Sequence, residues 1–169
     1  MTAWDTKLFY ALNDLAEKSE LWDRVFIFAG NYSIIIFSAV LLLYFFINRR
    51  AFWFAVFSAA LSRGILTEVI RYFYNRPRPF VALENVRVLI EKNAQEPSFP
   101  SGHAAFLFAI AFAVLLFDTK HGVVLFIAAA FFTVVRVIVG VHYPLDIAGG
   151  LLIAAFSVAL VRRFFKRSF

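Results

Sequence analysis

The chain has 169 residues, of which 62% are hydrophobic and 23 are phenylalanine, and its formal net charge is +6. A soluble domain has roughly 45–50% apolar residues, so this composition excludes an ordinary soluble fold and predicts one membrane-embedded domain over residues 1–169. The chain contains no cysteine, which excludes a disulfide framework, a thiolate metal site and a thiol nucleophile.

The first 21 residues predict an amphipathic helix that lies at the bilayer interface. Four apolar residues recur at helical spacing, and charged residues occupy the rest of the helix surface. The apolar set is Trp4, Leu8, Leu12 and Leu15, and the charged set is Asp5, Asp14, Glu17, Lys18 and Glu20. This pattern favours an interfacial helix over a membrane span or a signal peptide.

Five apolar segments follow, and each predicts a membrane helix. They cover residues 25–47, 51–74, 102–117, 122–140 and 145–165. Each approaches the roughly 17–25 residues that cross a bilayer, although the third is short. The sequence therefore predicts an all-α integral membrane bundle of about five transmembrane helices plus the interfacial helix, six helices in total.

The positively charged residues predict how this bundle is oriented. They cluster at three segment ends, in Asn48-Arg49-Arg50, in Asp118-Thr119-Lys120-His121, and in Arg162-Arg163 with Lys166-Arg167. By the positive-inside rule these ends face the cytoplasm. The N-terminus, the loop 75–101 and the connection 141–144 then face outward. All five prolines, and two of the three histidines, lie in or beside these outward connections.

The first polar cluster is "RYFYNRPRPF", residues 71–80. It contains Arg71, Arg76 and Arg78, and the two prolines Pro77 and Pro79 force the chain out of the helix. One interpretation is a basic anchor that touches lipid headgroups. The other is a clamp for phosphate, because guanidinium groups on stiff backbone suit bidentate contacts to phosphate oxygens.

The second cluster is "EPSFPSGHAAF", residues 96–106. Ser101 is a candidate N-cap for the third span, with Gly102 and His103 in its first turn. The free backbone N–H groups and the positive end of the helix dipole make this helix start an anion site. Gly102 lets an oxyanion approach the backbone closely because it has no side chain. Simple capping explains Ser101, but it does not explain His103.

The third cluster is "RVIVGVHYPLD", residues 136–146. Arg136 lies near the outer end of an apolar span, where an ionisable residue indicates function. Pro144 predicts the start of the fifth span, which places Asp146 within reach of His142. A carboxylate that bonds one ring nitrogen leaves the other as a base or nucleophile. The alternative is a capped helix with a buried ion pair.

The three clusters converge on one membrane face. Together they supply cationic donors, a helix N-terminus, two histidines and a carboxylate beside one of them. The sequence shows no group of Asp, Glu and His residues at metal-ligand spacing. This inventory predicts phosphoryl transfer without a metal or other cofactor.

The spacing of these residues resembles the type 2 phosphatidic acid phosphatase superfamily, whose signatures are KxxxxxxRP, PSGH and SRxxxxxHxxxD. The first appears as "RYFYNRPRP", with Arg71 in place of the usual Lys, and the second is intact as "PSGH". The third keeps its Arg, His and Asp, while Val135 replaces the usual Ser. The resemblance covers residues 51–165, which predicts a catalytic core there.

The resemblance implies a role for each motif residue. His142 would attack phosphorus and become transiently phosphorylated, with Asp146 orienting it. His103 would protonate the leaving oxygen and then activate water. The remaining motif residues would bind phosphate oxygens, namely Arg71, Arg78, Ser101, the Gly102 backbone and Arg136. Arg76 lies outside the motif and is a candidate headgroup contact. Arg63 and Glu68 indicate a structural pair instead.

The active face at the membrane surface predicts a lipid phosphate as substrate and the bilayer as its source, with no role for nucleic acid. Four stretches are similar to bacterial undecaprenyl pyrophosphate phosphatases, namely residues 4–33, "TEVIRYFYNRPRPF", "SFPSGHA" and "VGVHYPLDIAGG". That resemblance implies a bacterial cytoplasmic membrane protein with an outward active site. The subfamily often has Asp where this chain has Gly102.

Two alternatives stay open at this point. A sister phosphatase for phosphatidylglycerophosphate, phosphatidate or a lipid A phosphate would share the chemistry. A non-catalytic protein that binds or moves phospholipids would need the arginines but not the histidine–aspartate set. The sequence leaves the oligomeric state open.

Overall fold

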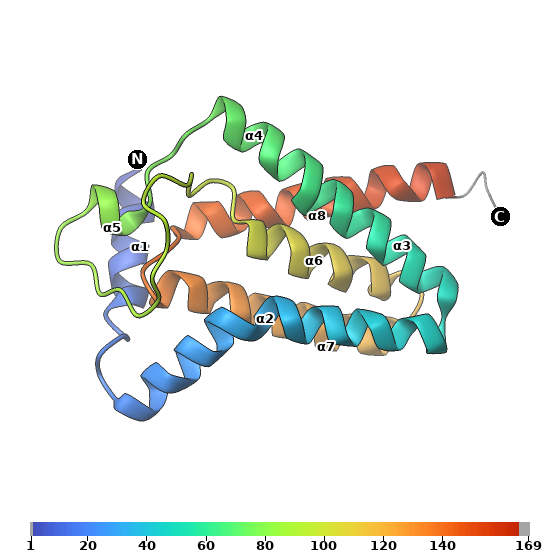
Figure 1. Cartoon of the computed structure of the whole chain (residues 1–169), viewed down its shortest axis with the longest axis horizontal. Coiled ribbons are helices and arrows are strands. Elements are labelled where there is room, and N and C mark those ends of the chain that lie inside the picture. The colour runs from blue at the N-terminus through green and yellow to red at the C-terminus, as the bar shows by residue number, and fades with distance from the viewer. Residues whose placement is uncertain (1, 166–169) are drawn as a thin grey trace.

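The computed structural model describes residues 2–165, which are helical without any strand (Figure 1). The predicted cytoplasmic pair Lys166-Arg167 lies outside these described residues. The chain forms α1 (Ala3–Asn13), α2 (Glu20–Ile47), α3 (Arg49–Ala59), the π-helical turn η1 (Ala60–Leu66), α4 (Thr67–Phe73), α5 (Pro79–Ala82), α6 (Gly102–Leu115), α7 (Thr119–Ile138) and α8 (Pro144–Phe165).

The predicted all-α class and the five apolar segments are confirmed. Helices α3, η1 and α4 form one continuous run over Arg49–Phe73. This run, α2, α7 and α8 are each long and apolar enough to span a membrane. Helix α6 corresponds to the short third segment and has only 14 residues.

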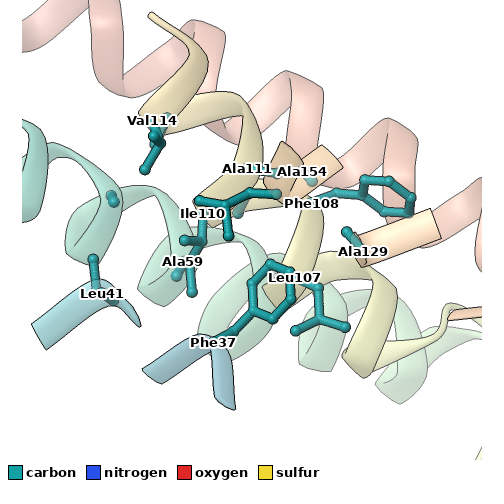
Figure 2. Packing of buried hydrophobic residues seen from close by; sticks show 14 of the residues in the cluster. Phe37, Leu41, Ala59, Leu107, Phe108, Ile110, Ala111, Val114, Ala129 and Ala154 are labelled. Carbon is teal, nitrogen blue, oxygen red and sulfur yellow. The ribbon is translucent and has the colours of Figure 1, made fainter. Parts of the chain in front are cut away.

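Helix α6 is the centre of the bundle. Ten of its 14 residues are buried and the other four are partly buried, and it packs against α3, α7 and α8. Figure 2 shows Leu107 and Ile110 of α6 among side chains from α2, α3, α7 and α8. A helix that meets protein on every side can be apolar all round.

A close approach between α6 and α8 aligns two of the predicted motifs. A Cβ atom on Gly150 would lie 2.6 Å from both the Ser101 carbonyl oxygen and the Ala104 Cβ. Glycine therefore allows the backbones to touch, as small residues do in packed membrane helices. The start of α6 is consequently held against the first turns of α8.

The two ends of the bundle differ in character. One end carries the α2–α3 and α6–α7 connections and the end of α8 (Figure 1). Its helices start with side-chain caps, because Asn48 accepts from the Ala51 N–H and Asp118 from the His121 N–H. The opposite end carries α1, α5 and the long loop, so all three predicted motifs lie there.

Helix α1 lies across this motif end and packs against α7 and α8 (Figure 1). Trp4, Leu8 and Leu15 are exposed, which agrees with the apolar stripe read from the sequence. Asp5, however, is not on an exposed polar face. It is fully buried. Asp5, Phe9 and Asn13 are spaced four residues apart and form a second, buried face of the helix. The position of α1 at the bilayer interface stays a prediction.

Helix α1 also secures the long loop. The Asn13 side-chain amide donates to the carbonyls of Arg87 and Ile138, both at 2.8 Å, and accepts from the Arg87 N–H at 3.0 Å. Tyr10 donates to the Glu84 carbonyl at 2.8 Å. Gly140 has φ +84°, and a Cβ there would meet the Arg87 carbonyl oxygen at 2.4 Å. Only glycine suits this contact.

Candidate active site

A cavity of about 80 Å³ opens at the motif end, among α2, η1, α4, α6, α7 and the long loop. Its lining residues are Ile34, Arg63, Arg71, Arg78, Lys92, Glu96, Gly102, His103, Arg136 and His142. Six of the residues proposed from the sequence therefore meet here, from segments up to 71 positions apart. Ser101 and Asp146 lie directly behind it, whereas Arg76 does not line it.

His142 is held in the connection between α7 and α8. Its backbone N–H and that of Val141 both donate to the Arg136 carbonyl at 3.2 Å, which wraps the chain around the end of α7. The side chain is 2% exposed. Its Nδ1 lies 3.4 Å from Oδ2 of Asp146, one helical turn further on. The contact at Nδ1 leaves Nε2 as the ring nitrogen available to a substrate.

Asp146 is held by more partners than the sequence indicated. Its Oδ2 accepts from the Ser98 hydroxyl at 2.5 Å and from the Tyr143 N–H at 2.8 Å, and its Oδ1 accepts from Arg76 at 2.7 Å. The Ser98 Oγ also lies 3.5 Å from Nδ1 of His142. The carboxylate is thereby fixed before it meets the imidazole.

Burial determines the protonation state of His142. It lowers the pKa of His142 to about 4, a shift that the hydrogen bond and charge of Asp146 oppose and the charges of Arg136 and Arg78 increase. The imidazole is consequently neutral near pH 7. A neutral imidazole has the free lone pair that a nucleophile requires.

Arg136 lines the cavity and has a buried donor without a partner in the part of the chain that the structure describes. Its guanidinium is 1% exposed and donates from Nη1 to the Gly30 carbonyl at 2.9 Å. Its Nε is buried and has no hydrogen-bond partner within residues 2–165. A buried donor without a partner is costly, so an anion bound in the cavity would relieve that cost.

The other two motif arginines are tied to backbone carbonyls. Arg71 donates from Nε and Nη2 to the Pro100 carbonyl at 3.3 and 3.0 Å, beside the start of α6. Arg78 is 2% exposed, donates to the Val141 carbonyl at 3.1 Å, and forms an ion pair with Glu96 at 3.1 Å. Burial lowers the pKa of Arg78, and Glu96 opposes this shift. Glu96 thus occupies donors that a phosphate would also use.

The predicted cap of α6 is confirmed. Ser101 Oγ accepts from the Ala104 N–H at 3.4 Å, and the Ser101 N–H donates to the Asp146 carbonyl at 3.0 Å. The helix start is thereby joined directly to the first turn of α8. Partly buried His103 follows one residue later and lines the cavity.

Two further cations at the cavity come from outside the motifs. Arg63 forms the predicted ion pair with Glu68. It also lines the cavity, and a Cβ on Gly102 would lie 2.5 Å from its Nε. Arg63 lies in η1, and π-helical turns are frequent at functional sites. Lys92 reaches the cavity from the long loop, and no sequence pattern singled it out.

The structure places Arg76 elsewhere than the expected headgroup contact. Its side chain is 8% exposed and forms ion pairs with Asp5 at 2.6 Å and Asp146 at 2.7 Å. Both guanidinium ends are therefore occupied by carboxylates inside the protein. Asp5 and Ser98, which the sequence did not single out, belong to the same set of contacts.

Cations dominate the cavity. Glu96 is the one carboxylate among the lining residues, and residues 2–165 contain no group of three His, Asp or Glu residues arranged to hold a metal ion. A neutral, buried histidine faces five cationic side chains here. Such a site suits nucleophilic attack on a phosphate group whose charge the guanidinium groups stabilise. These are the features of a phosphatase active site.

Comparison with known proteins identifies the family. Residues 51–169 match the sequence model of the PAP2 superfamily. The chain belongs to the PAP2 superfamily and is a multi-pass membrane phosphatase.

Individual relatives match almost the whole chain. Undecaprenyl-diphosphatase BcrC of Bacillus subtilis (strain 168) is 33% identical over 162 residues, covering 94% of this chain and 82% of that protein. Bacitracin transport permease protein BcrC of Bacillus licheniformis is 31% identical over 157 residues, covering 90% and 76%. The crystal structure of Aquifex aeolicus LpxE superposes with a TM-score of 0.82 at 28% identity, covering 96% of each chain.

Proposed function

We propose that this protein dephosphorylates a membrane lipid phosphate through a phosphohistidine intermediate, without a metal ion. The observation that carries the proposal is His142, which is buried, neutral and backed by Asp146, and which lines the same cavity as Arg136, whose Nε has no hydrogen-bond partner within residues 2–165. A neutral nucleophile next to unsatisfied cationic donors has the two features that an in-line attack on phosphorus needs.

The proposed reaction has two steps. His142 attacks phosphorus through Nε2, the bond from phosphorus to the leaving oxygen breaks, and that oxygen takes a proton from His103. Water then attacks the phosphohistidine while His103 accepts a proton from it, which releases phosphate and restores His142. Asp146 stabilises the positive charge on the phosphorylated imidazole.

The non-bridging oxygens are bound by three arginines and the start of α6. Arg136 contributes its free Nε, and Arg71 and Arg78, which line the same cavity, contribute charge. Ser101 holds the first turn of α6 so that the Gly102 backbone faces the phosphate. Arg78 exchanges part of its contact with Glu96 for the phosphate when a substrate enters.

We further propose undecaprenyl diphosphate as the substrate, which yields undecaprenyl phosphate and inorganic phosphate. Similarity to Undecaprenyl-diphosphatase BcrC over 94% of the chain supports this choice. The cations Arg63 and Lys92 support it as well, because they add to the three motif arginines at one small cavity. Partial burial and the charges of Arg136 and Arg78 lower the pKa of Lys92, so a second phosphate would favour its charged form.

The proposed location is a bacterial cytoplasmic membrane, with the active site on the extracytoplasmic side. Exposed basic residues gather at the end of the bundle opposite the cavity, namely Arg49, Arg50, Lys120, Arg162 and Arg163. The positive-inside rule assigns that end to the cytoplasm. The proposed role is recycling of a polyprenyl carrier in cell-wall synthesis.

A phosphatase for another lipid phosphate is the second candidate. It is favoured by the likeness to LpxE over 96% of both chains and by Gly102, where undecaprenyl pyrophosphate phosphatases often have Asp. The same residues would perform the same chemistry on phosphatidylglycerophosphate, phosphatidate or a lipid A phosphate.

The test is phosphate release by the purified protein in excess EDTA. Undecaprenyl diphosphate and the three alternative lipid phosphates are compared at equal surface concentration. We expect EDTA-resistant release that is fastest from the polyprenyl diphosphate. Preference for another lipid would retain the mechanism and replace the substrate, whereas no release from any of them would refute the proposed function.

A second arm tests the intermediate. The variant His103→Ala retains the nucleophile but lacks the acid of the first step and the base of the second, so the phosphohistidine should form slowly and, once formed, persist as labelled phosphate on the protein. The label should be acid-labile and base-stable, as expected for a phosphohistidine, and should be absent in His103→Ala/His142→Ala. Label that persists in the double variant would exclude His142 as the nucleophile.

A further inference from the structure

A buried ionic contact links helix α1 to the site. Asp5 is completely buried, although it lies four residues from the start of the chain. Its Oδ2 accepts from Nη2 of Arg76 at 2.6 Å, and its Oδ1 accepts from the Leu145 N–H at 3.0 Å. Asp5 therefore contacts both the arginine behind the site and the first turn of α8.

Arg76 continues this link to Asp146. Its Nη1 donates to Oδ1 of Asp146 at 2.7 Å, and its guanidinium lies 3.9 Å from the centre of the Tyr143 ring. Burial lowers the pKa of Arg76, but Asp146 and Asp5 more than offset this effect and raise it overall. Arg76 is thus a permanent cation between two carboxylates.

We propose that Asp5 is a positioning residue for the reaction, acting through Arg76 to set the geometry and the charge of Asp146 behind His142. The proposal rests on the proposed role of His142 as nucleophile. It assigns to the N-terminal helix a part in catalysis, although this helix lies outside the region 51–169 that matches the superfamily.

The geometric part follows from the two ends of the guanidinium. Arg76 is held by Asp5 at one end, so its other end fixes Oδ1 of Asp146. Oδ2 is then directed to Ser98 and His142. Without Asp5, Arg76 could swing toward the adjacent groove that it lines with Tyr74 and Phe99.

The electrostatic part follows from a count of charges. Arg76 alone would neutralise Asp146, which would leave nothing to stabilise a cationic imidazole. Asp5 adds a second negative charge, so the trio of two carboxylates and one guanidinium carries a net charge of −1. In a buried site this charge is weakly screened, so it stabilises the phosphorylated imidazole effectively.

The competing explanation is that Asp5 only attaches α1 to the bundle. Helix α1 already has a separate attachment at Asn13, which bonds the Arg87 and Ile138 carbonyls and touches no residue of the site. Asn13 is as buried as Asp5 and lies on the same helix face. It is therefore a matched control for attachment without the ionic contact.

The first experiment compares Asp5→Asn with Asn13→Ala. Asp5→Asn preserves shape and the acceptor for the Leu145 N–H but removes the charge. We expect it to lower kcat by roughly ten- to a hundredfold, the loss typical of a second layer of hydrogen-bonded residues, with KM changed less than about twofold. Asn13→Ala should lower thermal stability and leave kcat of the folded protein unchanged. Equal kcat values for Asp5→Asn and wild type would overturn the proposal.

The second experiment uses the charge count and does not depend on activity. The His142 imidazole is titrated by NMR in wild type, Asp5→Asn, Arg76→Gln and the double variant, where the trio carries −1, 0, −2 and −1. The pKa of His142 should be lowest in Asp5→Asn and highest in Arg76→Gln. The double variant should return toward wild type. If the contact between Asp5 and Arg76 were merely structural, the pKa of His142 in the double variant would not return toward the wild-type value.

The same groups surround His142 in all four proteins, so they cancel in the comparison. They are Asp146 from α8, Arg136 from α7, His103 from α6, Arg71 from α4, Arg63 from η1, and Arg78, Lys92 and Glu96 from the connection between α4 and α6. If wild type releases no phosphate from any lipid, the proposed function fails, and the NMR series still decides whether Asp5 is coupled to His142. If wild type is active and the four titrations coincide, the proposed function stands and this inference fails.

Discussion

Each end of the bundle holds a histidine, an aspartate and a lysine, and the two sets differ in their surroundings. At the capped end, Nδ1 of His121 lies 2.6 Å from Oδ2 of Asp118, with side chains 66% and 35% exposed. At the motif end, the corresponding distance from His142 to Asp146 is 3.4 Å, with side chains 2% and 0% exposed. The pair with the shorter distance, His121 and Asp118, is the exposed one, so water screens the interaction between its charges.

The difference shows that burial and neighbours, more than the distance between the two groups, make such a pair chemically useful. Asp118 caps α7, and the hydrogen bond from the His121 side chain lowers its pKa. An exposed pair of this kind contributes little to stability. The pair of His142 and Asp146 instead is buried beside a cavity lined by several arginines, one of which, Arg136, has a buried donor without a partner within residues 2–165.

The largest expected effect comes from replacing each histidine by alanine. His142→Ala should lower kcat by about 10⁴-fold or more, because it removes the nucleophile itself. His121→Ala should leave the rate of phosphate release within about twofold of wild type. Residual activity in His142→Ala above a hundredth of wild type would show that the nucleophile is another residue.

Replacing the aspartates should produce a smaller difference in kcat between the two ends than replacing the histidines. Asp146→Asn should lower kcat by about 10²- to 10⁴-fold, as expected when a carboxylate behind a catalytic imidazole is replaced by an amide. Asp118→Asn keeps a good N-cap residue, so both its rate and its melting temperature should match wild type. Measuring kcat and thermal unfolding together separates the two effects. Similar losses in both variants would contradict the contrast between the two ends.

The lysines test which phosphate groups are bound. Lys92→Gln should lower the ratio of kcat/KM for a polyprenyl diphosphate over a polyprenyl monophosphate by about fivefold, the value of one partly screened charge contact. Lys120→Gln, at the opposite end, is the control and should leave that ratio unchanged. A uniform loss on both substrates would indicate that Lys92 attracts anions in general and does not bind the second phosphate.

Much of the fold and the motif positions could be predicted from the sequence because those signals are local. Apolar runs predicted the helices, and Ser101 before an apolar helix predicted its cap. The residues of the three motifs were proposed from their spacing, and the structure brings most of them to one cavity. The central place of α6 was not predicted, although its uniformly apolar surface is typical of a helix enclosed by others.

The residues that were missed depend on contacts between distant segments. Asp5 looked like a charged residue on the polar face of an amphipathic helix, and its partner Arg76 lies 71 positions away. Ser98 lies three residues before the cap and reaches Asp146 across 48 positions. No helical period or turn pattern encodes such pairs. Tertiary packing alone decides that Arg76 pairs with two carboxylates inside the protein.

The smallest expected effect is on stability as the pH changes. The pKa of His142 is about 4 in the folded protein and near 6.5 in an unfolded chain. Between these values the unfolded chain binds a proton that the folded protein does not. Stability from the neutral His142 is therefore complete above about pH 6.5 and is lost as the pH falls toward 4.

This effect can be measured as the change in melting temperature between pH 7 and pH 5. The total loss should include a contribution on the order of 2 kcal/mol, or several degrees, from His142 in wild type and in His121→Gln. In His142→Gln it should be smaller by that amount, because glutamine binds no proton in either state. An equal drop in all three proteins would mean that folding leaves the pKa of His142 unchanged, which would contradict the shift that burial is expected to cause.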